Sequence, residues 1–351
     1  MASQGSGGPP YRAEHVGSLL RPPELTHAFR AYRQGEIAAD RFRQIQDQAI
    51  AEVVKLQEDV GLEVVTDGEF RRGSYWSHFV DAVEGLGVRQ SLFKFRDDEG
   101  KEQDFTAPHV EAKVRRTRGI STEEFAYLDS VTSRTPKITM PSPPTMHFYR
   151  GREGIDDGVY ADLGELFTDL AAVYRQEIAA LAELGARYIQ IDEVPLAMLC
   201  DADVRERLRA RGEDPEALVT SYIDALNWAL EDRPQGVTAG MHLCRGNFKG
   251  KYLAEGGYES VAERMFNEVA VDVFFLEYDT ARAGDFAPLR HVPNPKKVIL
   301  GLVSSKRPEL ESADELERRV DQASAFVPLE RLGLSPQCGF ASTVAGNPVS
   351  V

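Results

Sequence analysis

The sequence predicts an α/β fold of the (β/α)8, or TIM, barrel type. Short apolar runs rich in β-branched residues alternate along the chain with longer stretches of helical periodicity, and this alternation is typical of a parallel sheet with covering helices. The runs number eight, which favours a closed barrel over an open doubly wound sheet. The chain of 351 residues is longer than a typical barrel of about 250 residues, by a margin that insertions can fill.

The apolar runs predict the strands, and the periodic stretches between them predict the helices. In chain order we expect strands at residues 15–19, 62–65, 137–140, 187–191, 236–241, 271–276, 296–303 and 334–338. Apolar residues recur three and four positions apart in 38–60 and in 163–184, and a glycine follows each segment as a C-terminal stop. Ser312 and Glu315 form a capping box that predicts the start of a helix between the last two strands.

Two features depart from a plain barrel, and one segment is expected to lie outside it. Residues 89–118 alternate apolar and polar side chains around the turn-like DDEGKEQ, which predicts a β-hairpin inserted after the second strand. The chain stops soon after the last strand, so an eighth covering helix is not evident. Residues 1–10 are rich in Gly, Ser and Pro and predict a disordered tail, which leaves 11–351 as a single TIM-barrel catalytic domain.

Charge and composition exclude several classes of partner. The formal net charge of -15 argues against nucleic acid and against an anionic membrane surface, because clustered Lys and Arg bind both. No apolar run approaches the roughly 20 residues of a membrane span, and the first residues lack the features of a signal peptide. The three cysteines are too few and too scattered for a disulfide framework. We therefore expect a cytoplasmic protein with reduced thiols.

Polar residues gather where the expected strands end, and in barrels these carboxyl ends face the active site. His242 and Cys244 lie two apart on an extended segment, so both side chains point to the same face. Imidazole and thiolate together suit zinc better than magnesium or calcium, which prefer oxygen ligands alone. On this pair alone, a hydrogen-bonded histidine beside a buried structural cysteine is the commoner reading.

Six segments, taken together and in order, resemble a known family. They are HVGSLLRP (15–22), TDGEF (66–70), IQIDEVPL (189–196), MHLCRGN (241–247), FFLEYDT (274–280) and PQCGF (336–340). They are similar to the catalytic barrel of the cobalamin-independent methionine synthase family, and in particular to its short single-barrel 5-methyltetrahydropteroyltriglutamate–homocysteine S-methyltransferase-like members. The likeness spans nearly the whole chain, from about residue 11 to the end.

This resemblance implies a cofactor, a set of site residues and a reaction. A zinc ion, Zn2+, would be held by residues that match the family's ligands, namely His242, Cys244, Glu277 and Cys338. The family's contacts to its amino acid substrate fall on Ser18, Glu69 and Asp192, and the two carboxylates are the candidate catalytic groups. The implied reaction is methyl transfer from a donor to the thiol of homocysteine. Zinc would make the nucleophile, because a coordinated thiol is deprotonated outright.

Two positions depart from the family pattern where the methyl donor would bind. A histidine that can protonate the folate leaving group in full-length members is replaced by Val303, and the folate-stacking tryptophan matches Tyr149 best. An amine leaves poorly without a positioned acid, which typically contributes about 10²–10⁴-fold. Lys306 or His147 would have to supply the proton instead. The sequence therefore predicts that methyltetrahydropteroyltriglutamate is a poor donor.

Several other polar residues have plain structural interpretations. Asp67 and Glu193 are as well explained by helix capping as by a role in the site. A basic run that contains Arg115, Arg116 and Arg118 could hold an anionic donor tail, but such a run is more often a solvated face. Cys200 is expected to pack in the core. His78 could line the mouth of a pocket or simply pack, and the sequence does not decide between the two.

Three other functions remain open at the level of sequence. A related zinc-dependent alkyltransferase could act on another thiol, such as coenzyme M, but the carboxylates Glu69 and Asp192 disfavour this. A metal-free lyase of the uroporphyrinogen decarboxylase type shares this barrel, but it would not need the intact zinc ligands. A zinc-binding protein without catalysis would need no Ser18, Glu69 or Asp192.

Overall fold

The computed structural model of this protein describes residues 8–350. Most of the predicted tail, residues 1–7, therefore lies outside the described residues. Where the chain enters the structure, the carbonyl oxygen of Pro9 accepts a hydrogen bond of 3.4 Å from the hydroxyl of Thr238. Among the described residues, none of the helices is long and apolar enough to cross a membrane.

A parallel barrel forms the centre of the molecule, as the sequence predicts. Six strands pair side by side in the order β12-β11-β10-β9-β8-β7, and β1 pairs in parallel with β6, which runs almost directly into β7. The bounds of these strands are Val64–Val65 for β1, Thr135–Pro136 for β6, Ile138–Pro141 for β7, Tyr188–Glu193 for β8, Thr238–Leu243 for β9, Val273–Glu277 for β10, Lys297–Val303 for β11 and Leu332–Pro336 for β12.

The first expected strand, at 15–19, is not formed as such, and this prediction was wrong. A single parallel bridge joins Ala13 to Leu334 of β12, so the chain pairs with the sheet before residue 15 rather than after it. The backbone carbonyls beyond that point are occupied by side chains instead of by neighbouring strands. Those of His15, Val16 and Gly17 accept hydrogen bonds from Lys137, Gln190 and Thr66, in that order.

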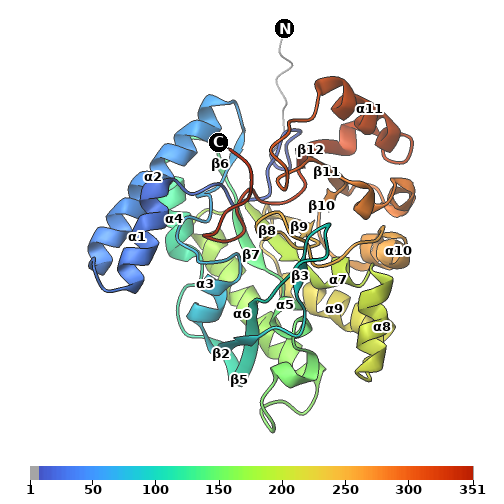
Figure 1. The fold of residues 1–351 in the computed structure, drawn as a ribbon, viewed down its shortest axis with the longest axis horizontal. Helices are drawn as coiled ribbons and strands as arrows, with labels where there is room; N and C mark the ends of the chain where they lie inside the picture. Colours follow the sequence, from blue (N-terminus) through green and yellow to red (C-terminus); the bar gives the residue numbers. More distant parts are fainter. Residues whose placement is uncertain (1–7, 351) are drawn as a thin grey trace.

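Helices cover the outside of the barrel in the order that the sequence predicts. In Figure 1, α1, α2 and α4 lie together on one side of the barrel, and α10 and α11 lie on the other. The two helices expected from periodicity and the one expected from the capping box are confirmed, and the Ser312 hydroxyl accepts from the Glu315 amide at the start of α11. The helices are α1 Pro23–Arg33, α2 Ala39–Asp59, α3 Ser77–Ala82, α4 Thr122–Ser130, α5 Thr145–Phe148, α6 Leu163–Glu183, α7 Pro195–Met198, α8 Ala202–Ala210, α9 Pro215–Leu230, α10 Glu259–Glu268 and α11 Ala313–Ser324, with short 3-10 turns at Gly151–Gly154, Ala281–Ala283, Ala287–His291 and Leu329–Arg331.

An antiparallel excursion lies between β1 and β6. Strand β2 (Val83–Gln90) pairs with β5 (Thr106–Arg116), and a second, shorter pair, β3 (Phe95–Arg96) with β4 (Glu102–Gln103), flanks the DDEGKEQ turn. The excursion begins earlier than residue 89, because β2 follows α3 directly. Its tip is tied to the loop after β9, where the backbone of Arg96 exchanges two hydrogen bonds with that of Tyr252, at 2.8 and 2.9 Å.

The flank without an eighth helix is closed by irregular chain. The guanidinium of Arg21 donates to four backbone carbonyls, two in the turn after β1 and two in the C-terminal segment, at Ala341 and Thr343. The C-terminal segment also pairs with residues 73–75, through the amides of Tyr75 and Val344. A single half-buried arginine thus joins both edges of the barrel where a helix would otherwise cover them.

A charged pair lies inside the barrel at the end opposite the carboxyl ends of the strands. The ammonium of Lys137 contacts a carboxylate oxygen of Glu14 at 3.1 Å, and both side chains are fully buried. The amide of Tyr11 and the hydroxyl of Tyr188 donate to the other Glu14 oxygen. Lys137 also lies 4.5 Å from the centre of the Phe275 ring. Every oxygen of this carboxylate is therefore satisfied.

Candidate active site

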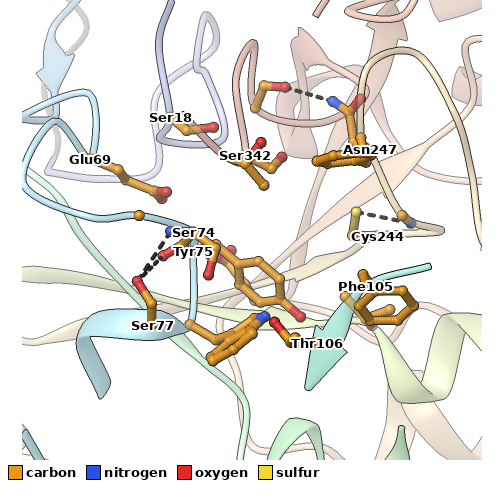
Figure 2. Close-up of a pocket in the computed structure, with 18 of the residues that line it drawn as sticks. Ser18, Glu69, Ser74, Tyr75, Ser77, Phe105, Thr106, Cys244, Asn247 and Ser342 are labelled. Carbon is orange, nitrogen blue, oxygen red and sulfur yellow. Dashed lines mark hydrogen bonds between the residues drawn. The ribbon is translucent and has the colours of Figure 1, made fainter. Parts of the chain in front are cut away.

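The carboxyl ends of the barrel strands open into a cavity of about 750 Å³. Its walls come from the segment around Ser18, the turn after β1, the antiparallel excursion, the ends of β8 and β9, and the C-terminal segment. Figure 2 shows Ser18 and Glu69 on one side of this cavity and Cys244 on the other, with Tyr75 between them. Residues from nearly the whole length of the chain thus meet in one space.

Four of the sequence-predicted residues form a compact buried cluster at the base of the cavity. One potential ligand atom from each of His242, Cys244, Glu277 and Cys338 lies within 4.8 Å of the others. Strand register brings them together, because His242 of β9 pairs with Phe275 of β10, two residues before Glu277. The sulfur atoms of Cys244 and Cys338 are 3.3 Å apart, and both cysteines are free.

The chemistry of this cluster fits a divalent metal with an affinity for sulfur. The Nε2 atom of His242 is buried and has no hydrogen-bond partner among residues 8–350. Contact with Cys244 holds the pKa of the Cys338 thiol well below its usual value. Two sulfurs, one imidazole and one carboxylate form a donor set that matches zinc.

Glu277 is held in place from the side away from the cavity. One carboxylate oxygen accepts from the amide of Arg245 at 2.8 Å, and the other lies 3.7 Å from the ammonium of Lys306. The Glu277 amide donates to the hydroxyl of Tyr258, which in turn accepts from the buried guanidinium of Arg245. The cavity wall itself contains His242, Cys244 and Cys338 but not Glu277.

Two buried carboxylates, Glu69 and Asp192, line the same cavity, and Asp192 of β8 pairs with His242 of β9 in the sheet. Glu69, which has a positive φ of 59°, accepts from the Thr139 hydroxyl at 2.8 Å through one oxygen, and its other oxygen has no partner among residues 8–350. Asp192 at the end of β8 accepts from Gln190 at 2.7 Å. Burial, and then the charge of Glu69, raise the pKa of Asp192 to about 7. A cation bound between the two carboxylates would relieve both effects.

Ser18 lies close to the cysteine segment because a glycine makes room for it. Its carbonyl accepts from the amide of Phe340 at 2.9 Å. A Cβ atom on Gly339 would lie only 1.9 Å from the Ser18 hydroxyl oxygen, so a larger residue after Cys338 would force the two segments apart. The buried Ser18 side chain thereby lines the cavity beside Cys338.

Tyr149 also lines the cavity, together with aromatic residues that sequence reasoning did not assign to a site. Its hydroxyl lies 3.1 Å from that of Tyr75, and its ring packs edge-on against Phe105 with centroids 5.3 Å apart. Trp76 and Phe248 complete this part of the wall. The alternation of apolar and polar side chains in residues 89–118 indicates that the excursion has a buried face, but it does not show which surface covers that face.

Glu193 caps a helix, as its structural interpretation predicts, whereas Asp67 stabilises a turn and no helix begins there. An oxygen of Asp67 accepts from the amide of Glu69 at 2.8 Å and holds the turn, while an oxygen of Glu193 accepts from the amide of Leu196 at 2.7 Å at the start of α7. Neither residue lines the cavity.

The remaining candidates lie away from the cavity. Arg115 and Arg116 pair with Glu84 and Glu177, and Arg118 donates to the Asp81 carbonyl. The thiol of Cys200 donates to the carbonyl of Leu196 in α7, and Cys200 packs against the core. The ring nitrogens of His78 are buried, and His78 does not line the cavity. None of these residues is placed to hold a donor or a metal.

The alternative proton donors are also displaced from the cavity. His147 hydrogen-bonds the Tyr222 hydroxyl at 2.9 Å, and burial lowers its pKa to about 4. Lys306 lies behind Glu277, and Val303 is the last residue of β11. Among the described residues that line the cavity, His242 is the only imidazole.

The buried Asp67 carboxyl gives a test by pH. Burial, and then the charge of Glu124, raise its pKa to about 6, above the usual unfolded value near 4. The folded state therefore holds the proton more tightly, and stability is lost as pH rises from about 4 to 6. Asp67→Asn removes this loss, so the free energy of unfolding of the variant relative to wild type should rise by about 3 kcal/mol between pH 4 and 7. Urea unfolding at several pH values measures it, and a constant difference would contradict the pKa.

Comparison with known proteins places these features in a family. Residues 13–347 match the family described as the catalytic domain of cobalamin-independent synthase. The chain is 40% identical over 345 residues to the uncharacterized protein YxjH of Bacillus subtilis, covering 96% of this chain and 89% of that one. It is 26% identical to a methionine synthase of Saccharolobus solfataricus, covering 92% and 86%. The crystal structure of a candidate vitamin B12-independent methionine synthase from Listeria monocytogenes has a TM-score of 0.77 and 35% identity, covering 96% and 93%.

The fold and the site define a class before any family is considered. The carboxyl ends of this (β/α)8 barrel carry a buried His-Cys-Glu-Cys cluster beside an open cavity. This arrangement defines a barrel enzyme with a candidate metal centre. The matches to known proteins narrow this class of barrel enzyme to one family. The chain belongs to the cobalamin-independent methionine synthase family, whose members are methyltransferases.

Proposed function

We propose that this protein is a zinc-dependent S-methyltransferase whose acceptor is homocysteine and whose product is methionine. The observation that carries this proposal is the position of the buried cluster His242, Cys244, Glu277 and Cys338 at the base of a cavity that two buried carboxylates, Glu69 and Asp192, also line. A thiol that reaches the cluster places the rest of its amino acid within the same cavity. The non-catalytic alternative offers no reason for such a cavity.

The residues of the chain divide the work between the two ends of the acceptor. Glu69 and Asp192 would bind its ammonium group, and Ser18 would contact its carboxylate. Zinc held by the cluster would supply a thiolate at neutral pH, because coordination lowers the pKa of a thiol. The amide of Arg245 fixes the Glu277 carboxylate and the hydroxyl of Tyr258 fixes the Glu277 backbone amide, which keeps the cluster ordered while the acceptor enters. The cavity walls restrict water around the sulfur.

The carboxylates also favour an amino acid thiol over a sulfonate thiol. Coenzyme M carries a sulfonate and no ammonium group, so it would bring a third negative charge beside Glu69 and Asp192. Both carboxylates are buried, where an unpaired like charge is strongly unfavourable. The intact cluster likewise favours a metal-dependent transferase over a metal-free lyase.

Asp192→Asn is expected to weaken homocysteine binding by roughly ten- to a hundredfold. The substitution keeps the size of the side chain but replaces a charge-assisted hydrogen bond, worth about 1.5–3 kcal/mol, with a neutral contact. Titration calorimetry of the zinc-loaded protein measures the affinity, and metal analysis of the same sample should show zinc unchanged.

Glu193→Gln provides the matched control for that experiment. Glu193 is the next residue and equally buried, but its oxygen accepts from a backbone amide and it does not line the cavity. Its substitution should leave homocysteine affinity nearly unchanged. Equal affinities in wild type and Asp192→Asn would remove Asp192 from the acceptor site.

A further inference from the structure

The part of the cavity wall beyond the cysteines is aromatic. Tyr75, Trp76, Phe105 and Tyr149 line it, and Figure 2 shows Phe105 on the same side of the cavity as Cys244, with Tyr75 at the centre. The rings are fixed relative to one another by the contact of 3.1 Å between the two tyrosine hydroxyls and by the edge-on packing of Phe105 on Tyr149.

The charges that line the cavity are mainly negative. Among the described lining residues, carboxylates come from Glu69, Asp81, Asp104 and Asp192, whereas lysine contributes none and arginine contributes two, Arg33 and Arg71. Arg71 is already paired with Asp47. Aromatic faces combined with negative charge attract a cation, and quaternary ammonium groups are bound by such aromatic cages.

Among the described residues that line the cavity, the one acid with a pKa near neutrality, Asp192, is assigned to the acceptor ammonium by the proposed function. The one lining imidazole belongs to the buried cluster, and His147 and Lys306 lie elsewhere. The hydroxyls of Tyr75 and Tyr149 are poor acids, because burial raises the pKa of both. A donor that needs no proton on departure fits this wall better than one that does.

Resting on the proposed function, we infer that the methyl donor is a small onium compound, a sulfonium or quaternary ammonium, bound against Tyr75, Trp76, Phe105 and Tyr149. The acceptor thiol loses its proton to solvent when it binds. Its sulfur then forms a bond to the methyl carbon while the bond from that carbon to the positive sulfur or nitrogen breaks. The electron pair of the broken bond stays on the leaving atom, which departs as a neutral thioether or tertiary amine.

Binding can be measured without turnover. The chain has two tryptophans, and Trp228 is the exposed one on α9. The substitution Trp228→Phe therefore leaves Trp76 in the cavity wall as the single tryptophan whose fluorescence is followed. In this background the probes are glycine betaine and its isostere 3,3-dimethylbutyrate, in which a neutral carbon replaces the positively charged nitrogen and the carboxylate is kept. Betaine should bind roughly fivefold to thirtyfold more tightly, as a desolvated cation–π contact predicts.

Variants of the cage locate that preference. Tyr75→Leu and Phe105→Leu should remove most of it, whereas Tyr75→Phe keeps the ring and should retain it. Thermal unfolding of each variant checks that the fold is intact. Equal binding of the two probes, or a preference that survives both leucine substitutions, would overturn the inference.

Turnover separates this inference from the proposed function. Zinc-loaded protein with homocysteine is offered S-methylmethionine, glycine betaine, or mono- and triglutamyl methyltetrahydrofolate, and methionine is quantified. We expect methionine from an onium donor at least tenfold faster than from either folate. Methionine formed from the triglutamyl folate alone would overturn the donor inference and leave the proposed function standing. Failure of homocysteine to bind in calorimetry would instead reject the function itself.

Discussion

The substitutions Cys244→Ser and Cys338→Ser are each expected to lower zinc affinity by more than about 100-fold. Even loss of a residue that merely orients a metal ligand typically costs about 10–100-fold, and these residues are proposed as ligands themselves. A serine hydroxyl is not deprotonated at neutral pH and offers no soft thiolate. Wild-type protein should purify with about one zinc per chain, and the variants with much less, as measured by elemental analysis and by competition with a chromogenic chelator.

The third cysteine makes this experiment internally controlled. Cys200 is half-buried after α7, where its thiol donates to the carbonyl of Leu196 at 3.5 Å, far along the chain from the cluster. Cys200→Ser makes the same chemical change and should keep full zinc. Zinc retained by both Cys244→Ser and Cys338→Ser would show that the metal, if bound, is held elsewhere. A loss that is as large in Cys200→Ser would point to general destabilisation instead.

The family resemblance predicts the four residues of the cluster, and the geometry of parallel strands explains why they meet. His242 and Cys244 share a face through the two-residue period of a strand, and Glu277 and Cys338 each follow a strand of the same parallel sheet. Parallel strands carry their carboxyl ends to one side of a barrel, so residues nearly a hundred positions apart must meet there. As a result, one potential ligand atom from each of the four residues lies within 4.8 Å of the others.

Apart from Tyr149, the aromatic wall could not be predicted, because it depends on contacts between distant and irregular segments. Phe105 reaches the cavity because the excursion folds back over the barrel. Arg96 of the excursion pairs there with Tyr252 in the loop after β9. Hydrophobic alternation shows that such a strand has a buried face, but it does not show what covers that face. The direction of an inserted hairpin is therefore set by its partner, about 150 residues further along the chain.

The first strand shows a second limit of pattern reading. The run from His15 to Leu19 is apolar enough for a strand, but polar side chains of Thr66, Lys137 and Gln190 take up the carbonyls that a neighbouring strand would need. Competition between side chains and backbone for the same acceptors is decided by tertiary structure. Arg21 likewise closes the flank that has no eighth helix, through hydrogen bonds to four backbone carbonyls.

Lys137→Met and Glu14→Gln are each expected to lower the free energy of unfolding by about 3–5 kcal/mol. The two side chains are fully buried and lie 3.1 Å apart, so removal of one charge leaves the other unpaired inside the barrel. Burial already lowers the pKa of Lys137, which shows how unfavourable its charge is in this position. Urea unfolding measures the loss. Lys55→Met, which removes an exposed lysine paired with Asp59 on α2, should change stability little.

The double variant Glu14→Gln with Lys137→Met distinguishes a mutual charge effect from simple loss of packing. With both charges removed, no ion is left unpaired, and an apolar replacement of a buried pair is often close to neutral. The double variant should therefore be more stable than either single variant, and the coupling free energy of the cycle should be several kcal/mol. Additive losses would mean that the two residues stabilise the barrel independently, through contacts such as that of Lys137 with the Phe275 ring and that of Glu14 with Tyr188. In that case the ion pair would carry none of the stability, even though its two atoms lie within hydrogen-bonding distance.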